Sequence, residues 1–387
     1  MKFLTLFCAV SSILIPVIYA GPTPAVTIQT VQGHKTGRHI VMLKPGVGKT
    51  GVLSQVSSIS GLKPDSNVTA QWGDALNGFS GNFDAATLAA LAKNPGVAGI
   101  VEDGIVKTTA TALNEPWGLS RINSKARLGC LDKALTYTYK YDDRAGQGVD
   151  IYIIDTGIRI THQDFGGRAK WSATFGGYAG TAVGGRWGVA KKANVFAIKV
   201  LSDSGSGSTT DVISGMNYAL SRAKSSGRPS VVSMSLGGSP NAALDAAARN
   251  LVASGLHLIV AAGNSNVDAV NSSPARVAEV ITVGASTITD ERSSFSNYGT
   301  LVDVFAPGTN IQSAWKDSDT STNIISGTSM ATPHVAGLIA YLISVQGNIT
   351  PAAMSQKLKD MSLKNMLNPY SLPSGTANRL VSNQYLI

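Results

Sequence analysis

Charged residues are scarce in this chain: Asp, Glu, Lys and Arg make up 14% of its 387 residues, whereas 43% are hydrophobic. Such an apolar composition excludes a disordered chain, and the length allows two or three domains. The 32 Lys and Arg exceed the 23 Asp and Glu and give a net charge of +9. No basic run is interleaved with aromatic residues, so the charge does not indicate a nucleic-acid partner.

Cysteine is also scarce, and one of the two, Cys8, lies in an N-terminal stretch that is typical of a secretory signal peptide. Lys2 gives this stretch a positive start, residues 3–19 are nearly all apolar, and Ala20 supplies the small residue before a cleavage site. A membrane anchor is the alternative, but the run has marginal length and no basic stop follows it. We therefore expect residues 1–20 to be a signal peptide and the protein to be secreted and extracellular.

Loss of the signal peptide leaves Cys130 as a lone cysteine, which excludes an internal disulfide. No later segment approaches the ~18 unbroken apolar residues of a membrane span, so we expect no membrane association. The stability of the mature protein must then come from a large core or from bound ions.

Secondary-structure patterns divide the remaining chain near residue 111. Before this point they predict a small α+β unit, with a strand over 38–43, a helix over 84–92 and a strand over 97–101. The threonine-rich stretch from Lys107 to Thr111 has no periodicity and suits an exposed linker that a protease can cut. We expect an N-terminal unit over 21–111 and a second domain over 112–387.

From residue 112 onward, short β-branched apolar strands alternate with helices. Strands that are apolar on both faces are typical of a buried parallel sheet. We predict strands over 149–154, 195–200, 231–235, 258–262 and 280–283, and helices over 210–225, 242–254, 328–346 and 351–361. This alternation predicts a doubly wound, mostly parallel α/β domain with its functional residues at the carboxyl ends of the strands.

Three short motifs lie at these strand ends. Asp155-Thr156-Gly157 offers a carboxylate that could orient an imidazole, although Asp-Thr-Gly also occurs in aspartic proteases and an Asp there is often only a turn former. Gly263-Asn264 offers a side-chain amide to a developing oxyanion, or is only a turn. Residues 326–337, with the sequence SGTSMATPHVAG, place Ser329 at the start of a helix whose N–H groups and dipole point at the serine oxygen.

In this order the motifs resemble those of the subtilisin family of serine endopeptidases, and most closely its proteinase K-like branch of secreted fungal enzymes. The resemblance implies that Ser329 is the nucleophile, that Asp155 is the acid that orients the base, and that Asn264 is an oxyanion donor beside the Ser329 N–H. It also implies that residues 38–106 form an inhibitor propeptide and that residues 115–387 form the peptidase domain.

The same resemblance implies that protein and peptide substrates bind as an added strand between two backbone segments. The residues of these segments that are expected to bind the substrate are Gly205, Ser206, Gly207, Ser233, Leu236 and Gly237. Small residues at 261–263 leave room for a bulky side chain, so we expect broad specificity with an apolar or aromatic residue at P1. The propeptide is expected to be an intramolecular inhibitor and folding aid of a monomeric enzyme, removed near Thr111-Ala112.

One part of the family pattern is absent. The family carries its general base in a His-Gly-Thr-His-x-Ala-Gly segment, whereas residues 175–181 of this chain read FGGYAGT. Phe175 matches the residue before that segment and Tyr178 begins its tail, so the catalytic histidine is missing between them. Two explanations stay open: a gene model that has skipped coding sequence of an active endopeptidase, or a genuine deletion that makes an inactive pseudoprotease, which binds peptides or serves as a decoy.

No histidine present is an evident substitute. Three of the five lie in the N-terminal unit or at a strand start away from the catalytic edge, namely His34, His39 and His257. His334 follows Ser329 by five residues on one helix, which places it about 140° around the axis and ~7.5 Å along it, too far for proton transfer. His162, in a loop seven residues after Asp155, is the remaining candidate.

The resemblance also implies a structural Ca²⁺ site, with the Asp303 carboxylate as a ligand and the carbonyls of Ala278 and Val280 nearby. The alternative is that Asp303 is a solvated loop residue. Sequons allow N-glycosylation on a secretory route at Asn67, Asn271 and Asn348.

Overall fold

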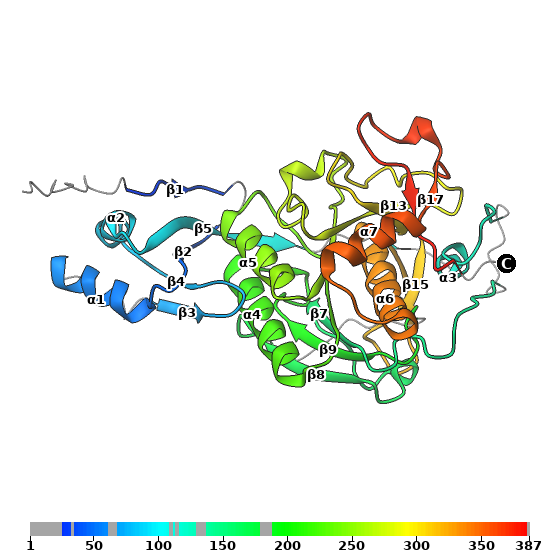
Figure 1. Cartoon of the computed structure of the whole chain (residues 1–387), viewed down its shortest axis with the longest axis horizontal. Coiled ribbons are helices and arrows are strands. Elements are labelled where there is room, and N and C mark those ends of the chain that lie inside the picture. Colours follow the sequence, from blue (N-terminus) through cyan, green and yellow to red (C-terminus); the bar gives the residue numbers. More distant parts are fainter. Residues whose placement is uncertain are drawn as a thin grey trace, which may run out of the picture.

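The computed structural model describes residues 25–31, 35–60, 68–107, 111–112, 116–128, 137–178 and 188–384. The expected signal peptide, His34, Asn67 and Cys130 lie outside these residues. In Figure 1 the N-terminal unit and the larger C-terminal domain lie side by side, with α4 (Thr209–Ser226) and α5 (Ala242–Ala253) between the unit and the main sheet.

The N-terminal unit is a twisted sheet with two helices, as the sequence predicts in outline. Its strand order is β1-β5-β2-β4-β3, with bounds β1 Ile28–Gln29, β2 Lys35–Leu43, β3 Val68–Trp72, β4 Gly78–Gly81 and β5 Val97–Lys107. Helices α1 (Lys49–Ser60) and α2 (Ala85–Lys93) pack on it, and Asp84 caps α2 through the Thr87 N–H. The sequence patterns did not predict α1, β3 or β4, because these segments mix polar and small residues.

The C-terminal domain is built on a nine-stranded sheet in the order β17-β18-β14-β13-β12-β11-β7-β9-β8. The bounds are β7 Asp150–Asp155, β8 Ala169–Thr174, β9 Asn194–Lys199, β11 Ser230–Met234, β12 His257–Ala261, β13 Ile281–Ser286, β14 Val304–Pro307, β17 Leu363–Lys364 and β18 Arg379–Leu380. All pairs except β17 with β18 are parallel. This arrangement confirms the doubly wound α/β prediction.

Helices cover both faces of this sheet because alternate strand residues point to opposite layers. Tyr152 and Ile154 pack in the cluster that contains α4 and α5, whereas Ile151 packs in the cluster of α6 (Thr328–Gln346) and α7 (Pro351–Met361). Among the described residues, α6 is long and apolar enough to cross a membrane, but 78% of its apolar stretch is buried inside the protein. It is therefore the central helix of a protein core.

Shorter elements complete the domain and join it to the N-terminal unit. These are β6 Thr111–Ala112, α3 Trp117–Arg121, β10 Ser206–Ser208, β15 Ile311–Ala314 and β16 Thr322–Ser326. We expected an exposed linker without regular structure from Lys107 to Thr111. In the structure both ends of this stretch pair with strands, because Lys107 pairs with β10 and Thr111 pairs with β16. Residues 108–110 lie outside the described part of the chain. Backbone pairing needs no side-chain periodicity, so the composition of this stretch did not reveal it.

Candidate active site

Asp155 is the last residue of β7, at the carboxyl edge of the sheet. The backbone N–H of Thr156 donates to its Oδ1 at 2.6 Å. Burial raises the pKa of Asp155 to about 6, although this hydrogen bond and the Lys199 ammonium on the neighbouring strand both favour the charged carboxylate. The side chain is thus a partly buried acid in a fixed orientation, as the orienting role requires.

Ser329 is the second residue of α6, and its side chain is buried. Its hydroxyl donates to the carbonyl of Ser235 at 3.1 Å, and the Ser235 hydroxyl donates to the Ser329 carbonyl at 2.9 Å. The first N–H groups of a helix have no partner within the helix, so this position directs positive dipole character at the serine. The sequence did not identify Ser235 as a contact of the nucleophile, because the two residues are 94 positions apart.

The Asn264 side chain is held beside the same helix start. Its Oδ1 accepts from the Thr328 N–H at 2.7 Å and from the Thr328 hydroxyl at 2.9 Å, so the carbonyl end of the amide faces Thr328. Gly263 has φ +105, and a Cβ there would lie 2.4 Å from Asn297 Nδ2. Glycine is therefore required for the turn that carries Asn264.

Asp155 and Ser329 line one cavity of about 460 Å³, although they are 174 positions apart. Its apolar walls come from the sheet and from the facing side of α6, including Ile151, Ile153, Val195, Ala336 and Gly337. Of the residues predicted to bind substrate, Gly205 and Ser233 also line it, whereas the Leu236 side chain is buried in the core. A carboxylate and a helix-terminal hydroxyl on one cavity are two of the three groups that acyl transfer requires.

The structure places the remaining histidines in other roles. His162 is buried, its Nε2 lies 3.1 Å from the Ser321 carbonyl, and it does not line the cavity. His257 bonds Asn348 Oδ1 at 2.8 Å. His334 does line the cavity, but its Nδ1 lies 2.8 Å from the Met330 carbonyl within the same helix, and burial lowers its pKa.

The segment expected to bind substrate accepts an added strand from the N-terminal unit. Residues 206–208 of β10 pair antiparallel with residues 105–107 of β5, with Ser206 opposite Lys107 and Gly207 opposite Val106. A Cβ at Gly207 would lie 2.3 Å from the Val200 carbonyl oxygen, so this edge must be built from a small residue. Farther along the chain, Thr111 pairs with Ser326, three residues before Ser329.

The N-terminal unit is anchored by a buried carboxylate at the start of α4. Asp103 is fully buried, and its Oδ1 accepts from the Thr210 N–H at 2.9 Å while its Oδ2 accepts from the Thr210 hydroxyl at 2.7 Å. Arg38 Nε also donates to Asp103 Oδ2 at 2.9 Å. Trp72 donates its indole N–H to Ser214 on the same helix at 3.0 Å. The adjacent acids Glu102 and Asp103 in an otherwise apolar strand were the sequence signal for this anchor.

Comparison with known proteins identifies the family of the chain. Residues 146–380 match the model of the subtilase family, and residues 39–109 match that of the peptidase inhibitor I9 family. The chain belongs to the subtilase family. The N-terminal unit is accordingly an I9 inhibitor domain, and the precursor is organised as a zymogen.

Similar proteins are fungal proteases and a solved subtilisin-like proteinase. The chain is 42% identical over 380 residues to the cuticle-degrading protease of Metarhizium anisopliae, covering 94% of each chain. It is 40% identical over 401 residues to a cuticle-degrading serine protease of Arthrobotrys oligospora, covering 95% of each. A solved cold-adapted subtilisin-like serine proteinase is 41% identical with a TM-score of 0.62, covering 70% of this chain and 99% of that one. The family to which this subtilase belongs consists of serine endopeptidases.

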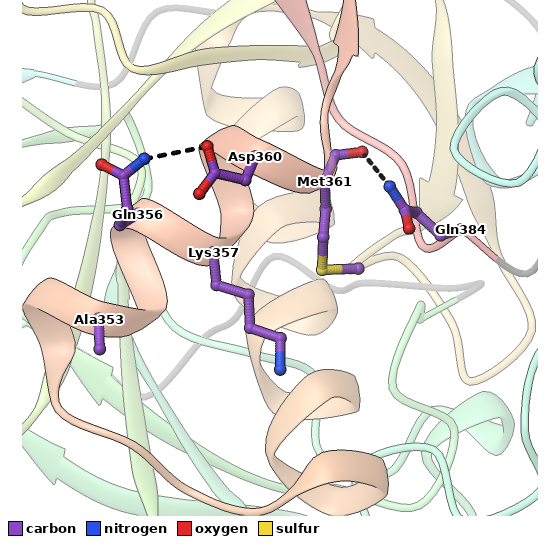
Figure 2. Close-up of a pocket in the computed structure, with 6 residues that line it drawn as sticks. All are labelled: Ala353, Gln356, Lys357, Asp360, Met361 and Gln384. Carbon is purple, nitrogen blue, oxygen red and sulfur yellow. Dashed lines mark hydrogen bonds between the residues drawn. The ribbon is translucent and has the colours of Figure 1, made fainter.

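A second concavity, of about 560 Å³, lies on α7 and shares no lining residue with the cavity of Asp155 and Ser329. Figure 2 shows the polar side chains along it, with Gln356 bonded to Asp360 and Gln384 bonded to the Met361 carbonyl. None of the groups that form the predicted active site contributes to it.

The residues around Asp303 do not fit the calcium site that the family resemblance implies. Its Oδ1 lies 2.7 Å from the Lys359 ammonium, and its Oδ2 accepts from the Thr282 N–H at 2.8 Å. Both oxygens are therefore engaged, one of them by a positive charge. Within the described residues there is no group of three or more His, Cys, Asp or Glu side chains that could hold a metal ion.

Replacing Asp155 by Asn should stabilise the subtilase at alkaline pH. Its raised pKa means that the folded state retains a proton that the unfolded state has lost, so wild-type stability falls as the pH rises from about 4 to about 6. We expect D155N to gain on the order of 1–3 kcal/mol at about pH 8 and nothing at about pH 3, measured by urea unfolding. Asp142→Asn is the control: Arg144 lowers the pKa of Asp142 to about 2, so this variant should lose stability above about pH 4. Equal responses of the two variants to pH would contradict the interpretation.

Proposed function

We propose that this subtilase is a secreted endopeptidase with an apolar or aromatic preference at P1, and that its complete chain carries a base-bearing segment between Phe175 and Tyr178. The observation that carries the proposal is the cavity shared by Asp155 and Ser329. Asp155 at the end of β7, Ser329 at the start of α6 and Asn264 after β12 would serve as acid, nucleophile and oxyanion donor, and an imidazole between the first two would complete the set. Secretion rests on the N-terminal sequence.

The roles of the residues follow from their positions. With an imidazole in the cavity, Asp155 accepts its Nδ1–H and fixes its orientation, and the other ring nitrogen takes the proton of Ser329. Ser329 Oγ then attacks the scissile carbonyl, while the Ser329 N–H and the Asn264 amide stabilise the oxyanion. The proton passes to the leaving amine as the C–N bond breaks, and water hydrolyses the acyl-enzyme with the same base.

The lining of the cavity favours a missing segment over a functional deletion. Asp155 and Ser329 both line it from separate elements, and it has a volume of about 460 Å³. A segment that enters this space would bring an imidazole to the acid and the nucleophile.

The P1 preference follows from small residues beside the nucleophile. Ala261 ends β12, and Ala262 and Gly263 follow it before Asn264. None of the three projects beyond a methyl group, so a bulky apolar side chain of the substrate has room next to the oxyanion donor. The cuticle-degrading names of two relatives are consistent with a protein substrate of broad composition.

The second candidate function is that of an inactive pseudoprotease, which the sequence as printed favours because His334 is the only described histidine on the cavity. Sequencing the transcript across Phe175 to Tyr178 separates the two. An additional in-frame segment with His-Gly-Thr-His supports the enzyme, and its absence rejects that proposal. Labelling of Ser329 in the purified chain by a fluorophosphonate would contradict the inactive alternative.

Loss of the Asp103 carboxylate should loosen the inhibitor domain. Asp103→Ala removes the carboxylate that accepts from the Thr210 N–H and from Arg38 Nε, and truncating such a charge typically costs about 2–5 kcal/mol at an interface. We expect hydrogen exchange of the paired β5 and β10 amides in the full chain to accelerate by about 30-fold or more. Asp74→Ala is the control, because Asp74 forms only an exposed pair with Lys224 at 3.3 Å. Similar exchange rates in both variants would contradict the anchoring role.

A further inference from the structure

Asp303 lies immediately before β14, with its side chain largely buried between the sheet and the last helix. Its carboxylate is 13% exposed, and the Lys359 side chain that meets it is 24% exposed. Lys359 lies in the final turn of α7, where a cation also interacts favourably with the helix dipole. The contact therefore joins α7 to the amino-terminal end of β14.

Every group described around this carboxylate is a hydrogen-bond donor. Oδ1 receives the Lys359 ammonium at 2.7 Å, and Oδ2 receives the Thr282 N–H at 2.8 Å. Arg379, on β18, donates to the Asp303 carbonyl at 3.5 Å and adds a second positive charge nearby. A buried carboxylate needs a cation beside it, and here the cation is supplied by the chain itself.

A calcium ion at Asp303 would meet an unfavourable environment. Ca²⁺ takes six to eight oxygen ligands at about 2.3–2.6 Å, and beside the expected carbonyls of Ala278 and Val280 the one carboxylate has an oxygen engaged by an ammonium and the other by an N–H. The ammonium and the Arg379 guanidinium also repel a divalent cation at this distance. The ion and Lys359 are therefore alternative partners of one carboxylate.

We propose that the Lys359 ammonium takes the place of a divalent cation at Asp303, so that this subtilase fastens α7 to its sheet without calcium at that position. The proposal is independent of catalysis and of the segment missing between Phe175 and Tyr178.

The test is thermal unfolding of the full chain in EDTA and in millimolar CaCl₂. We expect the wild type to have the same Tm in EDTA and in CaCl₂. The Tm of Asp303→Asn should respond to calcium no differently from that of the wild type. Lys359→Met should lower the Tm by several degrees in EDTA, because it leaves the carboxylate without a cation. CaCl₂ should then raise the Tm of this variant saturably, and adding Asp303→Asn to it should abolish that rise.

Lys357→Met is the matched control on the same helix. Lys357 lines the second concavity on α7, which Figure 2 shows and which Asp303 does not line. Its replacement should therefore change neither the Tm nor the calcium response. A calcium-induced rise in the wild type that Asp303→Asn removes would overturn the proposal. A Lys359→Met variant that is destabilised but insensitive to calcium would also overturn it, because the ammonium would then be an ordinary ion-pair partner.

Discussion

Insertion of a His-Gly-Thr-His segment of the family between Phe175 and Tyr178 is expected to raise kcat for peptide hydrolysis by about 10⁶-fold over the chain as printed. In subtilisin, a relative of this chain, loss of the triad serine or histidine costs roughly 2 × 10⁶ in kcat, and a residual ~10³–10⁴ over water remains. The gain is large because Asp155 and Ser329 already line one cavity, so the inserted base would meet both groups there once the Ser329 hydroxyl turns from the Ser235 carbonyl to the imidazole. Hydrolysis of a chromogenic peptide with an aromatic P1 residue measures it.

The matched control carries the same insertion with Ala in place of the catalytic histidine. It should fill the cavity without raising kcat. The active variant should also cut its own chain near Thr111-Ala112, since Thr111 pairs with Ser326, three residues before Ser329. Equal activity of the two insertions, or an unprocessed active variant, would contradict the proposed arrangement.

Replacing Asp290 by Asn is expected to be the most destabilising single change among the described ion pairs. Asp290 and Arg121 are both fully buried and joined by two bonds, of 2.7 and 3.0 Å. Breaking a buried pair by removing one partner costs about 3–5 kcal/mol, because the remaining charge is left in the interior. For a domain of this size we expect the Tm to fall by about 6–20 °C, measured by calorimetry.

Asn is the sharpest substitution at this position because Asp290 has φ +57, a conformation that Asn also tolerates. The loss then reports on charge and not on backbone strain. Arg144→Met is the control, since Arg144 makes an equally short contact of 2.8 Å with Asp142 but is 56% exposed. An exposed pair contributes about 0–1 kcal/mol, so comparable losses in the two variants would rule out burial as the cause.

Much of the fold could be predicted from the sequence because burial leaves a local pattern. The five predicted strands and four predicted helices of the C-terminal domain appear within one residue of their predicted bounds, except that β13 ends three residues later, and α6 and α7 coincide with the prediction. Strands β8 and β14 were not predicted. The three motifs could also be placed at strand ends, because the carboxyl end of a strand is marked in the sequence by the change from apolar residues to loop residues. In the N-terminal unit, α1 was not predicted, although Val52, Leu53 and Val56 have helical spacing and are buried, because Gly, Thr and Ser, which are weak helix formers, take most of its other positions.

The sequence by itself determined the family motifs, their order and the loss of the base, because each depends only on neighbouring residues. The tertiary structure alone decided which distant residues meet: Ser235 at the nucleophile, Asp103 at the start of α4, and Lys359 at Asp303. It also replaced two expectations, the exposed linker and the calcium ligand, with strand pairing and an ion pair. These contacts join residues that are far apart in the chain. The packing of the layers and the closure of the loops decide which residues meet, and the local hydrophobic period of a sequence carries no information about either.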